Sequence, residues 1–151
     1  MKNFNYVVEK RGVCVLNQEF IHPRDLFHCG QAFRWEEINK NHFILVALER
    51  VIEVVKEDRN LCLMNTTEED FLNLWINYFD LDTNYEKIIK TLSKDDPVMK
   101  KATEFGKGIR ILKQEPFETF ITFIISSNNN IKRIKGSIEK IARGYGKTIG
   151  E

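Results

Sequence analysis

The stretch His42–Met64, HFILVALERVIEVVKEDRNLCLM, decides the fold class. It contains three apolar runs: the first two follow one another directly, and Asp58-Arg59-Asn60 provides a turn before the third. Parallel strands need a long crossover connection, usually a helix, and nothing of that length separates these runs. The pattern therefore predicts an antiparallel meander with strands over 42–48, 51–55 and 61–64.

Two more strands are predicted on the N-terminal side of this stretch. Tyr6-Val7-Val8 and Val13–Leu16 flank Lys10-Arg11-Gly12, which has the composition of a tight turn. Residues 1–65 are therefore expected to form strands without intervening helices.

On the C-terminal side, beyond Asn65, apolar residues recur at three and four, which is typical of helix faces. Four helix starts are predicted: Thr66 with Glu69, Thr83 with Glu86, Asp96-Pro97 and Glu115-Pro116. The third helix is expected to end near Gly106, and a last helix to run from about Ile131 to Gly144, after a break at Asn128–Asn130. Strands first and helices afterwards predict an α+β protein with a boundary near 95–115.

The composition narrows the class of protein. The 151 residues, 42% of them hydrophobic, suffice for one ordinary domain or two small ones. No apolar run reaches the ~18 residues that a membrane span needs, and no secretory signal is recognisable, so we expect a cytoplasmic protein. Cys14, Cys29 and Cys62 lie far apart, which argues against a disulfide scaffold or a zinc cage and predicts reduced thiols. The three histidines, His22, His28 and His42, do not form a metal-ligand set.

The net charge of +1 hides an asymmetry along the chain. Residues 1–97 carry 12 Lys and Arg against 17 Asp and Glu, whereas residues 98–151 carry 11 against 5. The positive C-terminal part is a candidate surface for phosphate groups. The alternative is a solvated helix face that happens to be rich in lysine.

The stretch Pro116–Ser127, PFETFITFIISS, is apolar nearly all round a helix. Glu118, Thr119 and Thr122 do not form a continuous polar stripe, and such a helix is usually buried on all sides. The neighbouring helices can cover about half of it, so we expect the chain to be the N-terminal part of a longer protein. The alternative is that the sheet covers the remaining surface.

Three motifs occur in an order that resembles the 8-oxoguanine DNA glycosylases. They are Gly30-Gln31-Ala32-Phe33-Arg34-Trp35, Tyr78-Phe79-Asp80-Leu81-Asp82, and Gly108–Glu118 leading into Phe123–Ile134. The resemblance covers nearly the whole chain but only the N-terminal half of the family's length.

The resemblance implies a twisted antiparallel sheet, similar to the TATA-binding protein, packed with helices over 1–107. Residues 108–151 would then be the first helices of an incomplete helical domain. The family excises 8-oxoguanine opposite cytosine from double-stranded DNA, in base excision repair. The enzyme flips the base out, a lysine amine displaces it from the sugar, and a Schiff base permits strand cleavage. No cofactor or metal is implied, and the full-length protein is expected to be a monomer.

Three residues of this chain match positions that read DNA in the family. Gly30 matches the glycine whose carbonyl accepts the N7 hydrogen that 8-oxoguanine has and guanine lacks. Asn128 and Arg133 match residues that contact the cytosine opposite the lesion. Gln31, Phe33 and Trp35 are expected to pack around Gly30 rather than to touch DNA.

The departures from the family are equally informative. A hairpin of the L-P-G-V-G-x-K type is absent, no lysine or aspartate matches the catalytic pair, and Gly144-Tyr145-Gly146-Lys147 is interpreted as a helix stop. We therefore assign no catalytic residue and expect the 151-residue chain alone to be inactive and to bind DNA weakly and salt-sensitively. Two alternatives stay open: a stand-alone, non-catalytic DNA- or protein-binding module, and a glycosylase for other damaged purines.

Overall fold

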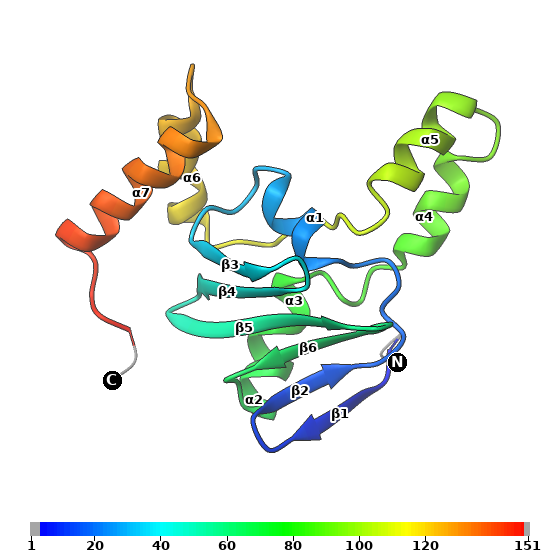
Figure 1. Cartoon of the computed structure of the whole chain (residues 1–151), viewed down its shortest axis with the longest axis horizontal. Coiled ribbons are helices and arrows are strands. Elements are labelled where there is room, and N and C mark those ends of the chain that lie inside the picture. Colours follow the sequence, from blue (N-terminus) through cyan, green and yellow to red (C-terminus); the bar gives the residue numbers. More distant parts are fainter. Residues whose placement is uncertain (1–3, 150–151) are drawn as a thin grey trace.

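The computed structural model describes residues 4–149, and its centre is one six-stranded antiparallel sheet (Figure 1). The strands are β1 (Tyr6–Glu9), β2 (Gly12–Val15), β3 (Trp35–Asn39), β4 (His42–Ala47), β5 (Arg50–Glu57) and β6 (Asn60–Met64). Their order in the sheet is β1-β2-β6-β5-β4-β3, so β3 to β6 form a meander and the β1–β2 hairpin joins it along β6. The predicted meander and all five predicted strands are confirmed.

Helices cover one face of this sheet. A continuous helical stretch made of α2 (Glu68–Asp70), a π-helical turn η1 (Phe71–Trp75) and α3 (Ile76–Tyr78) lies behind the sheet in Figure 1. Alternate residues of β4, Phe43, Leu45 and Ala47, are buried against the helices, as expected for strands with one covered face. We call the six strands, this helical stretch and α1 (Pro23–His28) together the sheet body.

One helix of the sheet body departs from the sequence prediction. Helix α1 (Pro23–His28) lies between β2 and β3, where only strands were expected. It begins with Pro23 at its first position, and Nδ1 of His22 accepts a hydrogen bond from the Arg24 amide at 3.2 Å. Six residues are too few to show a helical period, which is why the apolar pattern did not reveal it.

The later helices are α4 (Tyr85–Leu92), α5 (Pro97–Phe105), α6 (Pro116–Ser126) and α7 (Ile131–Tyr145). The predicted starts at Asp96 and Glu115 are confirmed, because both side chains accept amide hydrogen bonds of the first turn. The other two starts are each wrong by one residue. Thr67 rather than Thr66 caps α2, and Asn84 rather than Thr83 caps α4.

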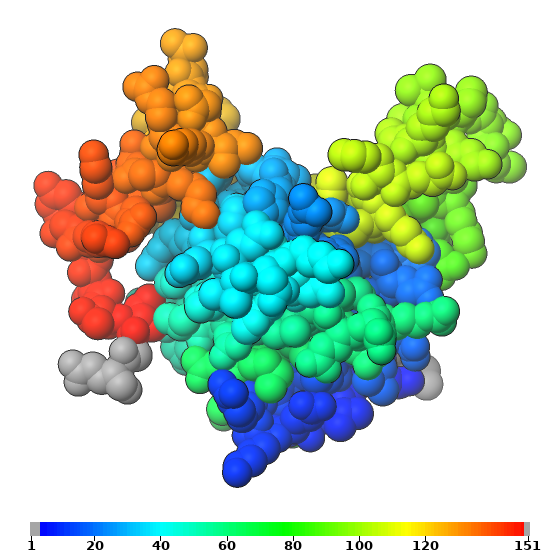
Figure 2. Space-filling model, in the orientation of Figure 1, coloured from blue at the N-terminus to red at the C-terminus, as the bar shows by residue number. Residues whose placement is uncertain are grey.

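Two helix pairs, α4–α5 and α6–α7, project from the same side of the sheet body, with a notch between them in this view (Figure 2). The exposed fractions of Phe117, Phe120 and Phe123 on α6 are 71%, 59% and 74%. The prediction that neighbouring helices cover only part of α6 is confirmed, and the alternative that the sheet covers the rest is wrong.

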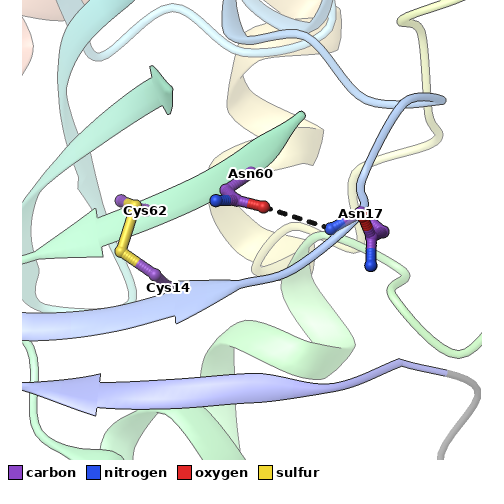
Figure 3. Close-up of a disulfide and its surroundings, with 4 residues drawn as sticks. All are labelled: Cys14, Asn17, Asn60 and Cys62. Atoms are coloured by element: carbon purple, nitrogen blue, oxygen red, sulfur yellow. Dashed lines mark hydrogen bonds between the residues drawn. A yellow bond between two sulfur atoms is a disulfide. The ribbon is translucent and has the colours of Figure 1, made fainter. Parts of the chain in front are cut away.

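The prediction of three reduced cysteines is also wrong. Cys14 of β2 lies directly opposite Cys62 of β6, with 4.0 Å between their Cα atoms, and their sulfur atoms are bonded (Figure 3). The two residues are 48 positions apart in sequence, so only the pairing of β2 with β6 brings them together. Cys29 is a free thiol and is exposed.

Candidate nucleic-acid interface

Gly30 lies in the loop between α1 and β3, next to the first turn of α7. Its φ angle is +84°, which L-residues with a side chain rarely adopt. A Cβ atom at this position would meet only Cδ1 of Ile131, at 3.8 Å. The backbone conformation rather than crowding therefore requires glycine, and the contact shows that the loop and the start of α7 are neighbours.

The turn between α6 and α7 uses its three asparagines in different ways. Asn129 donates from Nδ2 to the Ile125 carbonyl at 3.0 Å, and Oδ1 of Asn130 accepts from the Arg133 amide at 3.1 Å. Asn128 has a φ of +50° and is exposed. Within residues 4–149 its side chain has no hydrogen-bond partner, so its amide is available to a ligand.

The first turn of α7 is positively charged. It contains Lys132 and Arg133 and no acidic residue. Cations at a helix N-terminus oppose the helix dipole, which normally favours Asp or Glu there. In the described part of the chain Arg133 is exposed and forms no ion pair. This conflict with a local stability rule is typical of a functional site, and the combined charge of dipole and side chains suits an anionic ligand.

The motif residues after Gly30 attach the loop to both α6 and α7. Phe33 packs in a small buried cluster with Ile134 and Ile138 of α7. Arg34 lies 3.8 Å from the carboxylate of Glu118 on α6. Burial raises the pKa of Glu118 above its ordinary value, although Arg34 opposes this shift.

The ring of Trp35 makes a cation–π contact with Lys135 of α7. Nζ of Lys135 lies 3.4 Å from the centre of the Trp35 ring and donates to the Trp35 carbonyl at 2.8 Å. Burial lowers the pKa of Lys135. The expectation that Phe33 and Trp35 serve packing agrees with these contacts, whereas the side chain of Gln31 forms hydrogen bonds with backbone groups of residues 110 and 112.

Residues 108–114, which we call the linking segment, connect α5 to α6 and run along the sheet body. Gly108 fits closely: its carbonyl accepts from the His22 amide at 3.0 Å, and a Cβ atom at 108 would meet Cβ of His22 at 2.5 Å. The side chain of Arg110 is buried, and its Nε and Nη1 donate to the carbonyls of Phe20 and Asp80 at 3.1 and 2.8 Å. Burial lowers the pKa of Arg110, but these carbonyls stabilise the guanidinium.

The structure also bears on the predicted end of the last helix and on metal and membrane binding. Helix α7 continues through Gly144, and Gly146 rather than Gly144 ends it, with its amide donating to the Ala142 carbonyl at 2.8 Å. Across residues 4–149, no cluster of three or more His, Cys, Asp or Glu side chains is placed to bind a metal ion. None of the described helices is long and apolar enough to cross a bilayer.

Comparison with known proteins agrees with the motifs. A family model described as 8-oxoguanine DNA glycosylase, N-terminal domain, matches residues 13–120. The chain belongs to this family. The resemblance found in the three sequence motifs is thereby confirmed.

Solved structures of the family share the fold. A structure of MBOgg1 in complex with a low-affinity DNA ligand superposes with a TM-score of 0.93 at 40% identity, covering 100% of this chain and 52% of that chain. The Clostridium acetobutylicum 8-oxoguanine glycosylase/lyase, in complex with dsDNA containing cytosine opposite 8-oxoG, gives a TM-score of 0.90 at 42% identity, covering 98% and 50%.

A curated relative is the N-glycosylase/DNA lyase of Saccharomyces cerevisiae, which is 28% identical over 154 aligned positions. The alignment covers 93% of this chain and 40% of the yeast protein. The chain therefore spans about half the length of the two solved relatives and less than half of the yeast protein.

Proposed function

We propose that the whole protein is a DNA glycosylase with AP lyase activity that excises 8-oxoguanine opposite cytosine. In this proposal the chain is the N-terminal part, with residues 1–107 as its sheet-plus-helices domain and 108–151 as the start of the helical domain. The observation that carries the proposal is the contact between the Gly30 loop and α7. It supports the proposal because Ile131, which lies beside Gly30, comes three residues after Asn128, whose side chain is exposed.

Gly30 would distinguish the oxidised base by a single hydrogen bond. A backbone carbonyl only accepts, so it pairs with the N7–H of 8-oxoguanine and opposes the N7 lone pair of guanine. A site built to form one hydrogen bond with a substrate binds an analogue without that hydrogen-bonding group much more weakly, because a buried polar group of the site is then left unpaired. The absence of a side chain at Gly30 leaves the approach to its carbonyl open.

Asn128 and Arg133 would read the cytosine that remains after the target base leaves the helix. The amide of Asn128 both donates and accepts, and the guanidinium of Arg133 donates, which matches the acceptors and the amino group of cytosine. The positive first turn of α7 supports contact with phosphate groups nearby. The two side chains are exposed, as a DNA contact requires.

The proposal also covers the catalytic groups, the binding partner and the location of the enzyme. The activity needs a lysine nucleophile and an acid, to which no residue of 1–151 is assigned, and it needs no cofactor. Substrate binding would involve double-stranded DNA and no membrane, with a monomeric enzyme acting in the cytoplasm.

Borohydride trapping tests the proposal on a duplex with one 8-oxoguanine·cytosine pair. Reduction of a Schiff base leaves a covalent protein–DNA adduct. We expect an adduct from the whole gene product and none from residues 1–151 alone. An adduct from residues 1–151 would overturn the assignment of the nucleophile to another part of the protein. Absence of an adduct from the whole gene product would instead favour a binding module, and an adduct only on other damaged purines would favour a different substrate.

A further inference from the structure

Gln31, the residue after Gly30, has a side-chain amide that is engaged on both sides by the linking segment. Its Nε2 donates to the Arg110 carbonyl at 2.7 Å, and its Oε1 accepts from the Leu112 amide at 2.9 Å. The two partners are 79 and 81 positions away in sequence. The amide thus pairs with alternate residues of the linking segment, as a neighbouring strand would.

The backbone of Gln31 is held as well. Its carbonyl accepts from Nε2 of Gln114 at 2.5 Å. The carbonyl of Gly30 and the amide of Gln31 belong to one planar peptide unit. Glycine itself allows wide rotation, so the orientation of this peptide depends on restraint from the Gln31 side. The three hydrogen bonds of Gln31 supply that restraint.

The linking segment, to which Gln31 is hydrogen-bonded, is itself held to the sheet body by hydrogen bonds. Arg110 is anchored to two carbonyls of the sheet body, and the Lys113 amide donates to the Tyr78 carbonyl at 2.9 Å. The segment then leads directly into α6, which ends at the turn containing Asn128. Gln31 therefore connects the peptide of Gly30 to the helix pair that carries the candidate opposite-base contacts.

We infer that Gln31 is a positioning residue for lesion recognition: its side-chain amide fixes the Gly30 carbonyl relative to α6 and α7. This inference rests on the proposed role of Gly30. It assigns Gln31 no contact with DNA, and it makes discrimination between 8-oxoguanine and guanine depend on a residue that touches neither base.

Two nearly isosteric variants separate positioning from packing. Gln31→Glu keeps an acceptor for the Leu112 amide but loses the donor to the Arg110 carbonyl and places two oxygen atoms against each other. Gln31→Met keeps the length of the side chain and removes both hydrogen bonds. If Gln31 only fills space, both variants should behave as the wild type does. Thr66→Val is a matched control, because it removes the 2.9 Å hydrogen bond that Nε1 of Trp75 in η1 donates to Thr66, the residue before the cap of α2. In Figure 1, α2 lies at the opposite end of the sheet body from α6 and α7.

The measurement is the ratio of affinities for 8-oxoguanine·cytosine and guanine·cytosine duplexes, made on the whole gene product at one salt concentration. A ratio within one protein does not depend on the folded fraction. We expect both Gln31 variants to lower it about tenfold, which corresponds to the loss of one well-oriented hydrogen bond. Thr66→Val should leave it unchanged, whatever its effect on stability.

Each outcome decides between the two proposals. A ratio within about twofold of the wild type in both Gln31 variants, including an equal loss of affinity for both duplexes, overturns the positioning role while Gly30 keeps its own. A wild-type protein that does not discriminate between the duplexes overturns the proposed role of Gly30, and the role of Gln31 with it. If Gln31→Met does not fold, the ratio of Gln31→Glu decides alone.

Discussion

Phe43 in β4 and Phe123 in α6 are the same residue in opposite surroundings. Phe43 is completely buried in the sheet body, whereas 74% of Phe123 is exposed. Phe43 belongs to a large core cluster that the strands and helices of the sheet body cover. Within residues 4–149, the α6–α7 pair contributes Ile134 and Ile138 to a small buried cluster, and it also carries uncovered apolar side chains and the candidate opposite-base contacts. The comparison shows that the core that stabilises the chain lies in the sheet body, whereas the candidate opposite-base contacts lie on a helix pair that contributes little to this core.

The largest expected effect tests this comparison directly. Phe43→Ala should lower the free energy of unfolding of the 151-residue chain by about 4 kcal/mol, because a large cavity forms in the core. Phe123→Ala, the same chemical change, should alter it by less than about 0.5 kcal/mol. Urea denaturation of both variants measures the difference. Equal losses would show that the α6 surface is covered in solution, for example by a second copy of the chain.

The disulfide provides the next largest effect, and it lies entirely within the sheet body. Cys14 and Cys62 close a loop of 48 residues, and such a link stabilises chiefly by restricting the unfolded chain. Replacing both by serine should lower the free energy of unfolding by about 3 kcal/mol. Cys29→Ser is the control and should change little. A chain purified without reductant that reacts with a thiol reagent at three cysteines after unfolding would contradict the bond.

The disulfide also illustrates what the sequence could and could not predict. Strands and helix starts follow from patterns within ten residues, so the meander and the caps at Asp96 and Glu115 were predictable. Pairing between β2 and β6 depends on the whole sheet, and its consequence, the contact of Cys14 with Cys62, has no local signal.

In the candidate site, too, contacts between residues far apart in the chain could not be predicted from local sequence patterns. Gly30, Asn128 and Arg133 were found through motifs, not through any property of single residues. The hydrogen bonds of the Gln31 side chain could not be predicted, because its partners lie about eighty positions away and are backbone groups, which any residue provides. Helix α1 was missed because it is too short to show a period.

A buried carboxylate at the join between the two regions should give a pH-dependent effect. Burial raises the pKa of Asp80, but hydrogen bonds from Lys113, Thr83 and Tyr85 outweigh burial, so its pKa lies below the ordinary value. A lowered folded-state pKa stabilises the protein above the unfolded value, near pH 4, and this stabilisation is lost as the pH falls through the folded value.

Asp80→Asn should therefore cost about 2 kcal/mol at pH 7, the usual contribution of hydrogen bonds to a charged group. The difference from the wild type should shrink below about pH 4. Unfolding curves at pH 7, 5 and 3 measure it. A difference that is independent of pH would show that the charge of Asp80 does not contribute.

Two neighbouring asparagines sharpen the contrast between function and stability. Asn128→Gly removes the side-chain amide but keeps a residue that readily adopts the φ of +50° found here. It should weaken binding of the whole gene product to an 8-oxoguanine·cytosine duplex about tenfold and leave its melting temperature nearly unchanged. Asn129→Ala removes the hydrogen bond to the Ile125 carbonyl, so it should lower the melting temperature by a few degrees. If the variant at 129 lost DNA affinity and the variant at 128 lost melting temperature instead, Asn129 rather than Asn128 would face the DNA.

The smallest expected effect concerns the charges at the start of α7. Lys132→Glu exchanges an unfavourable charge for a favourable one in the first turn, so it should raise the free energy of unfolding by about 0.5 kcal/mol. The same change should weaken DNA binding and make it less dependent on salt, because it removes a cation from the proposed interface. Lys140→Glu, an identical change of charge in the middle of α7, controls for net charge and should lack the gain in stability. A gain in stability at Lys132 without a loss of DNA affinity would show that the positive first turn is not maintained for binding, and the case for this surface would then rest on Asn128 and Arg133 alone.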